Sequence, residues 1–118
     1  MLVADIIGRG WCIPSGRVEA HETSREAVHR EALEEGGAIL KDVQYIGCYQ
    51  IADRAQVRWA DCYVARISKL VDIVMTEESQ ARKLVTLDEL PDIYHLWNPL
   101  TKRVFEHSWD VLMRRRNP

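Results

Sequence analysis

One short helix, with both of its ends marked in the sequence, constrains this chain more than any other feature. Thr23 and Glu26 form a capping box, in which each side chain accepts a hydrogen bond from the backbone N–H of the other residue. Gly36-Gly37 supplies the matching stop, because glycine readily takes the left-handed conformation that ends helices. The two signals predict a helix over residues 24–35, around which the rest of the chain must pack.

Three glutamates lie on one face of this expected helix. Glu31, Glu34 and Glu35 stand at positions i, i+3 and i+4, so their carboxylates are neighbours. Like charges at this spacing destabilise an isolated helix by about 0.2–0.5 kcal/mol per pair. A hard divalent cation would relieve the repulsion. Taken alone, an acidic stripe is more often a solvated helix face, so the surrounding residues must decide between the two interpretations.

Those surrounding residues form a longer pattern. It runs Gly16, five residues, Glu22, seven residues, Arg30-Glu31-Ala32-Leu33-Glu34-Glu35, one residue, then Gly37-Ala38. This resembles the Nudix box of the MutT-like Nudix hydrolases, GX5EX7REUXEEXGU with U a bulky aliphatic residue, although the alanines at both U positions, Ala32 and Ala38, are small. At ordinary residue frequencies a given window would match the seven fixed positions by chance with a probability on the order of 10⁻⁸.

The resemblance implies roles for the matching residues. Glu22 would pair with Arg30 and hold the preceding loop on the helix. The residues implied to bind the metal, usually magnesium or manganese, are Gly16, Glu31, Glu34 and Glu35. A further carboxylate from a distal loop often serves the family as base or extra ligand. We expect Glu78 in that role, with Glu77 beside it as the other candidate and an ordinary solvated loop as the alternative.

The implied activity is hydrolysis of a nucleoside diphosphate linked to another moiety, by water attack on a pyrophosphate phosphorus. We expect a nucleoside di- or triphosphate as substrate, with nucleotide sugars as the second choice. A catalytically weak nucleotide-binding or regulatory module and an acidic interaction domain are the alternatives. Trp11 and Tyr49 flank the box and are the aromatic residues expected to contact the base, although most aromatic residues in such a chain simply form the core.

Composition limits the other classes of function. The chain has 118 residues, of which 47% are hydrophobic and 29% charged, with a net charge of -2. These values predict a single domain over residues 1–118 and exclude a disordered chain. They give no global positive field for polymeric nucleic acid, and no apolar run suits a membrane span. Three scattered cysteines and the absence of a signal-peptide pattern favour the cytoplasm.

The remaining hydrophobic pattern is mainly that of strands. Strands are expected over 2–7, 11–13, 43–52, 57–67 and 83–86, with a turn over 87–91. Leu100, Val104, Val111 and Leu112 recur at helical spacing and predict a last helix. The resemblance implies that these elements form an α/β/α sandwich with a mixed sheet.

The start of the chain is short for such a domain. Only 15 residues precede Gly16, whereas the family usually has a longer N-terminal stretch that supplies extra strand. An unpaired sheet edge is a template for pairing with another chain. We therefore expect a homodimer.

Overall fold

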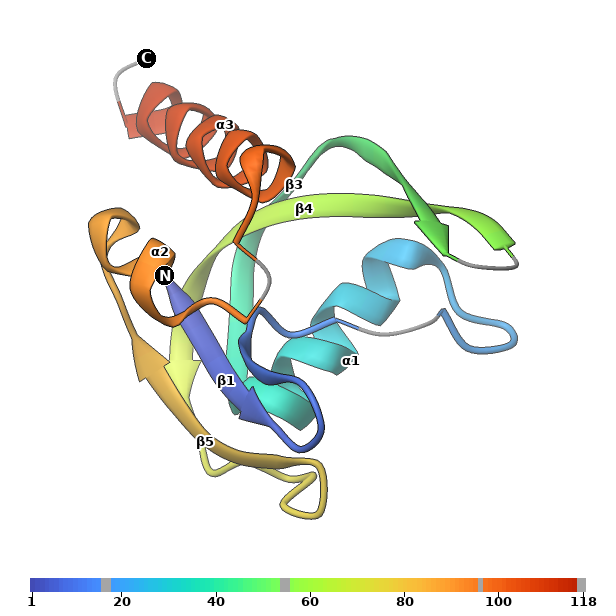
Figure 1. Cartoon of the computed structure of the whole chain (residues 1–118). Helices are drawn as coiled ribbons and strands as arrows, with labels where there is room; N and C mark the ends of the chain where they lie inside the picture. Colours follow the sequence, from blue (N-terminus) through green and yellow to red (C-terminus); the bar gives the residue numbers. More distant parts are fainter. Residues whose placement is uncertain (16–17, 54–55, 96, 117–118) are drawn as a thin grey trace.

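The computed structural model describes residues 1–15, 18–53, 56–95 and 97–116. Its strands, in chain order, are β1 (Leu2–Ile6), β2 (Gly10–Cys12), β3 (Ala38–Asp53), β4 (Gln56–Leu70) and β5 (Ser79–Leu84) (Figure 1). Its helical elements are α1 (Ser24–Gly36), the 3₁₀ turn η1 (Leu87–Glu89), α2 (Leu90–Ile93) and α3 (Pro99–Arg116). In this part of the chain, no helix is both long and apolar enough to cross a membrane.

The strands form two antiparallel sheets. One has the order β2-β1-β5, and the other is the long β3–β4 hairpin. The fold is mixed α/β, although every ladder between described residues is antiparallel and none supplies the parallel pair of a mixed sheet.

Helices α1 and α3 lie on opposite sides of the β3–β4 hairpin (Figure 1). Neighbouring side chains of a strand point to opposite faces. Tyr63 of β4 accordingly contacts Ser24 of α1, with 2.5 Å between the two hydroxyl oxygens. Its neighbour Cys62 lines a cavity together with Val104 of α3. This arrangement is the expected α/β/α sandwich.

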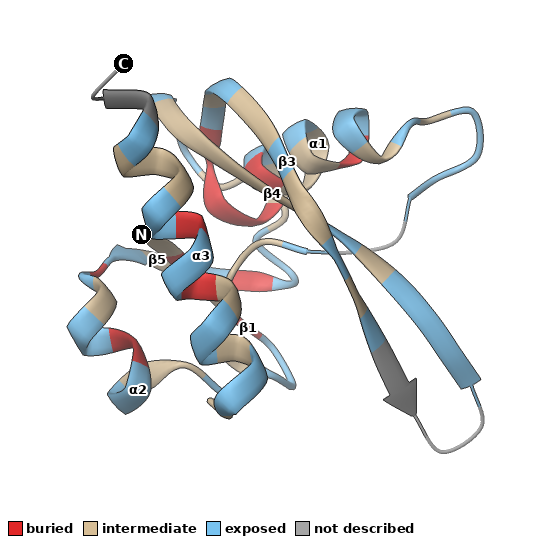
Figure 2. Ribbon diagram, turned by 90° about the horizontal axis from the view of Figure 1, so that it is seen from above, coloured by how far each residue is buried: buried red, intermediate tan, exposed pale blue. Residues whose placement is uncertain are grey.

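The buried core is small and lies where the three-stranded sheet meets the C-terminal helices. Its main cluster of buried residues consists of Val3, Val85, Leu90 and Phe105. The end of β4 near the hairpin turn is exposed, and Trp59 is 67% accessible there (Figure 2). The hairpin thus extends beyond the core.

The predicted elements differ in how closely they match. The helix predicted over 24–35 is confirmed, and the hairpin is confirmed with strands longer than expected. The strand predicted over 83–86 was misplaced, because pairing with β1 sets β5 between Ser79 and Leu84. The turn predicted over 87–91 is instead η1 followed by α2, beginning after a second capping box of Thr86 and Glu89.

The last helix is confirmed as α3, and its predicted apolar positions are buried to different extents. Among the helix residues whose burial is described, Phe105 and Ser108 are buried, Val104, Val111 and Leu112 are half-buried, and Leu100 is 47% exposed. The spacing of aliphatic residues therefore located the helix and three of its half-buried positions, but it did not identify the buried Phe105 and Ser108.

Candidate active site

Helix α1 carries the predicted carboxylates, and local signals set both of its ends. The Glu26 N–H donates to Thr23 Oγ1 and the Thr23 N–H donates to Glu26 Oε1, each at 3.1 Å. At the other end Gly37 takes the left-handed conformation with φ 59°. With its start and end set by these caps, the helix brings Glu31, Glu34 and Glu35 onto one face.

Arg30 joins the helix to the loop before it. Its Nε donates to Glu22 Oε2 at 2.8 Å and its Nη2 donates to Glu22 Oε1 at 3.1 Å, so the guanidinium grips the carboxylate with two parallel bonds. This is the contact that the resemblance implies. The hydrogen bonds from Arg30 hold the pKa of Glu22 below its ordinary value.

Arg30 also contacts two of the helix carboxylates, which the sequence pattern did not predict. Its Nη1 donates to Glu31 Oε1 at 2.9 Å and to Glu34 Oε2 at 3.1 Å. Burial nevertheless raises the pKa of Glu31, with Arg30 opposing the shift. One guanidinium therefore offsets much of the negative charge on this face.

Glu35 is the carboxylate with the least compensation. Its residue is only 3% exposed, and its Oε1 accepts a hydrogen bond from the Ser15 N–H at 3.3 Å. Burial, with the charges of Glu31 and Glu78 adding to it, raises the pKa of Glu35 to about 7. The Ser15 hydrogen bond and the charge of Arg9 act in the opposite direction. A cation bound beside Glu35 would therefore stabilise the charged form of this carboxylate.

The structure brings Glu78 to the same place from the loop before β5. Its backbone is fixed, because the Ile7 N–H donates to the Glu78 carbonyl at 2.9 Å and the Glu78 N–H donates to Met75 O at 3.0 Å. Its side chain is exposed, yet its charge raises the pKa of both Glu31 and Glu35. The distal carboxylate expected from the sequence therefore lies near the helix carboxylates.

The donor set suits a hard divalent cation in its chemistry. All the candidate side-chain ligands are carboxylates, and one of them is buried with its charge poorly offset. Within the described residues no three Asp, Glu, His or Cys side chains are gathered into a metal cluster. Glu31 and Glu34 instead turn toward Arg30. Gly16, the fourth residue expected to bind metal, lies outside the described residues.

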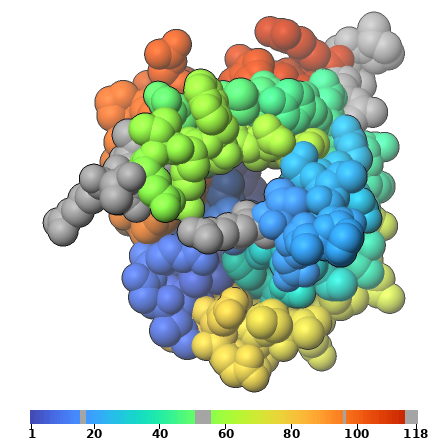
Figure 3. All heavy atoms as spheres, turned by 90° about the vertical axis from the view of Figure 1, so that its right-hand side faces the viewer, coloured from blue at the N-terminus to red at the C-terminus, as the bar shows by residue number. Residues whose placement is uncertain are grey.

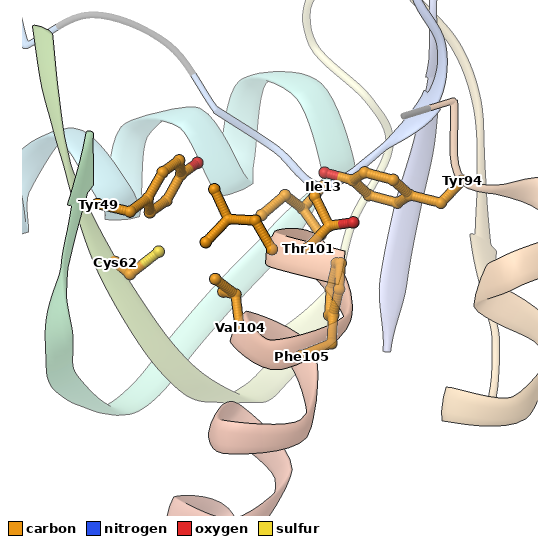
Figure 4. Close-up of a pocket in the computed structure, with 8 residues that line it drawn as sticks. Ile13, Tyr49, Cys62, Tyr94, Thr101, Val104 and Phe105 are labelled. Atoms are coloured by element: carbon orange, nitrogen blue, oxygen red, sulfur yellow. The ribbon is translucent and has the colours of Figure 1, made fainter. Parts of the chain in front are cut away.

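The two aromatic candidates for base binding lie in different surroundings. Tyr49 is half-buried and lines a small, mostly apolar cavity of about 40 Å³ (Figure 4). Cys62 lies beside it on the hairpin, while Tyr94 lies across the cavity and Val104 rises from α3. Trp11 packs against the main core cluster instead.

Arg9 is a charged residue near Glu35 that the sequence pattern did not indicate. Arg9 is exposed in the turn between β1 and β2, and its charge lowers the pKa of Glu35. The sequence signal for Arg9 is its position between Gly8 and Gly10, which predicts an exposed turn. This signal is weak, because only the fold brings the turn close to α1.

The Glu22–Arg30 pair predicts a pH-dependent stability. Because the pKa of Glu22 is lower in the folded protein, its contribution is present above the ordinary value of about 4.5 and is lost as the pH falls through the lowered value. Glu22→Gln should therefore destabilise the protein most at neutral pH. Urea unfolding in chelator, between about pH 7 and pH 3, should show the difference from wild type shrinking on acidification. A difference of constant size would contradict this account.

Comparison with known proteins identifies the family of this chain. A model of the NUDIX domain matches residues 2–107. The chain is 34% identical over 84 residues to YtkD of Bacillus subtilis (strain 168), provisionally named an 8-oxo-dGTP diphosphatase. That match covers 71% of this chain and 52% of YtkD, so the chain spans about half the length of this curated relative.

Solved structures share the fold at lower identity. The Bacillus subtilis pyrophosphohydrolase BsRppH matches with a TM-score of 0.78 at 24% identity, over 93% of this chain and 73% of that one. A NUDIX hydrolase from Nitrosomonas europaea matches with a TM-score of 0.75 at 20% identity, over 90% of this chain and 77% of that one. Since the family model matches nearly the whole chain, this protein belongs to the Nudix hydrolase family, a family of pyrophosphohydrolases.

Proposed function

We propose that this protein hydrolyses a pyrophosphate bond of a nucleotide in a reaction that depends on a divalent metal ion. The observation that carries the proposal is the buried Glu35, whose charge is disfavoured by burial and by Glu31 and Glu78 beside it. Such an arrangement is costly for folding alone and useful for holding a cation. Nudix enzymes generally use a divalent metal ion, which agrees with this interpretation.

A nucleoside di- or triphosphate is the substrate class that we favour. YtkD is provisionally named for hydrolysis of the triphosphate 8-oxo-dGTP. This name supports a nucleoside triphosphate as the substrate, and the proposed class includes nucleotides with a damaged base. The molecule has a hollow bordered by the β3–β4 hairpin, the first half of α1 and the first strands (Figure 3). A nucleotide sugar is the second choice.

We assign the side chains roles in this reaction. Glu31, Glu34 and Glu35 would hold the metal, which when bound neutralises charge on phosphate oxygens and lowers the pKa of the attacking water. Glu78 is the candidate base: as the water oxygen bonds to phosphorus and the bridging P–O bond breaks, its carboxylate takes the proton of the water. Arg9, exposed beside Glu35, is placed to bind a substrate phosphate.

Tyr49 is the better of the two candidates for contact with the base. It lines the cavity beside the hairpin, whereas Trp11 is committed to the core. The cavity of about 40 Å³ is far below the roughly 300 Å³ at which ligand pockets begin, so a base would bind at its mouth. The predicted homodimer and the cytoplasmic location stay predictions.

Glu35→Gln tests the proposed reaction. With magnesium or manganese, the wild type should release product from a nucleoside di- or triphosphate in a panel that also holds nucleotide sugars and dinucleoside polyphosphates. The substitution should lower kcat at least about 100-fold, since stabilisation of the transition-state charge by a metal is worth several kcal/mol. The isosteric amide removes a buried charge, so thermal unfolding in chelator should show no loss of stability.

Glu106→Gln is the matched control for this experiment. Glu106 is exposed on α3 and pairs only at the surface with Lys102, so its substitution should leave kcat unchanged. Metal binding without turnover of any substrate would favour the nucleotide-binding module. Equal activity of Glu35→Gln and wild type would overturn the proposal.

Glu78 and its neighbour Glu77 form a natural pair for testing the base. Both are exposed glutamates in the same loop, and Glu78 is the one whose charge acts on Glu31 and Glu35. Glu78→Gln should lower kcat by about 100-fold or more, the range for loss of a general base, while Glu77→Gln should change it less than about twofold. Steady-state kinetics at saturating metal measures both. The reverse order would move the role to Glu77.

Tyr49→Leu tests the contact with the base. The change keeps an apolar side chain but removes the aromatic face, whose contribution to such contacts is about 0.5–1.5 kcal/mol. KM should rise about twofold to thirteenfold for a nucleotide, while inorganic triphosphate, which has no base, should be used equally well by both proteins. An equal loss for both compounds would show that Tyr49 supports the fold rather than the base.

A further inference from the structure

The C-terminal end of α1 is capped locally by the Gly37 N–H, which bonds to Leu33 O at 3.0 Å, and beyond that carbonyl by a distant part of the chain. The last four carbonyls of a helix have no partner within it. Here Glu34 O accepts from the Met75 N–H at 3.1 Å, and Glu35 O accepts from Ser79 Oγ at 2.6 Å. Gly37 O accepts from the Val71 N–H at 2.7 Å. We call residues 71–82 the capping segment.

Arg82 completes this cap. Its Nη1 donates to Gly36 O at 3.2 Å, to Gly37 O at 3.0 Å and also to Val71 O. It thus ties the last residues of the helix to the start of the capping segment. A Cβ added at Gly37 would collide with Val71 O and with the Arg82 guanidinium, so this position requires glycine for space as well as for its backbone conformation.

Arg82 also supplies a charge that the helix lacks. The last turn of α1 contains no basic residue, although cations there favour the negative end of the helix dipole. The same end carries the carboxylates of Glu34 and Glu35, which adds to the negative charge. Arg82 reaches the helix from β5, where it pairs with Ala4 of β1, and so fixes its cation on a rigid strand.

The capping segment carries Glu78 as well. Glu78 directly precedes Ser79, which is 1% exposed and bonds to the carbonyl of Glu35. The hydrogen bonds of the cap therefore decide how far Glu78 lies from the helix carboxylates. A metal site made of groups from both elements needs that relation held to within roughly 0.5 Å.

We propose that Arg82 is a positioning residue for the metal site: by fastening the capping segment to the end of α1, it sets the relation of Glu78 to Glu31, Glu34 and Glu35. The inference rests on the proposed function. Within the part of the chain that the structure describes, Arg82 bonds to backbone carbonyls rather than to the proposed ligand side chains, so it acts through the backbone of the helix that carries them.

Arg82→Gln, with Lys83→Gln as matched control, tests the proposal. Lys83 is the next residue of β5 and is exposed, so the control removes one positive charge at nearly the same place. Electron paramagnetic resonance of Mn²⁺ should show a dissociation constant raised about tenfold or more by Arg82→Gln, as for other groups that orient metal ligands, and less than twofold by Lys83→Gln. Arg82→Lys should restore part of the affinity.

Hydrogen exchange in chelator gives a second measurement, independent of metal and activity. The amide of Met75, which bonds to Glu34 O, should exchange faster in Arg82→Gln than in wild type or Lys83→Gln. If Arg82→Gln does not fold, Ser79→Ala, which removes a different bond of the same cap, should show both effects.

The outcomes separate the two proposals. A folded Arg82→Gln variant with wild-type Mn²⁺ affinity would overturn the positioning role and leave the proposed function standing. Faster Met75 exchange with unchanged affinity would show a purely structural cap and also overturn it. Failure of the wild type to bind Mn²⁺ would overturn the proposed metal site, and the inference with it.

Discussion

The concentration of negative charge at the end of one helix is the constraint on which the rest of this structure depends. Glu31, Glu34 and Glu35 lie in the last turns of α1, where the helix dipole is already negative. Arg30 donates hydrogen bonds to the carboxylates of Glu31 and Glu34, and Arg82 donates to the carbonyl at the end of the helix. What is left uncompensated is concentrated on Glu35, which is buried. The negative charge is thus offset least at Glu35, which is where we propose that a cation binds.

Local signals explain why α1 and the hairpin could be predicted. A capping box and a following glycine act within a few residues, and so does the alternation of a strand, hence neither needs the rest of the chain. Strand β5 was misplaced because its first residues, beginning at Ser79, have little strand preference and are extended only by pairing with β1. The buried face of α3 likewise depends on what packs against it.

The site residues also divide into those that local signals predict and those that only the fold brings together. The pairing of Arg30 with Glu22 follows from the spacing of a known motif, and the three helix carboxylates follow from helical geometry. The bond from the Ser15 N–H to Glu35 could not be predicted, since it joins residues whose distance only the fold determines. Arg82 gave no signal either, because the groups it bonds are backbone carbonyls, which every residue has.

The way α1 is attached explains how a small core can support such a site. The buried residues of the helix are Ala27, Ala32, Glu35 and Gly36, so it contributes little apolar surface to the core. Packing of small side chains allows a close approach but resists sliding and rotation weakly. Directional hydrogen bonds resist such movement at both ends of the helix. Near its start the Arg25 guanidinium donates to Val43 O at 2.7 Å, and at its C-terminal end the capping segment donates to the last carbonyls. A helix fixed in this way keeps its carboxylates in register with Glu78 because both ends are tied to other elements, whereas the small apolar face alone, in which Ala27 and Ala32 are the buried apolar side chains, would hold that register less firmly.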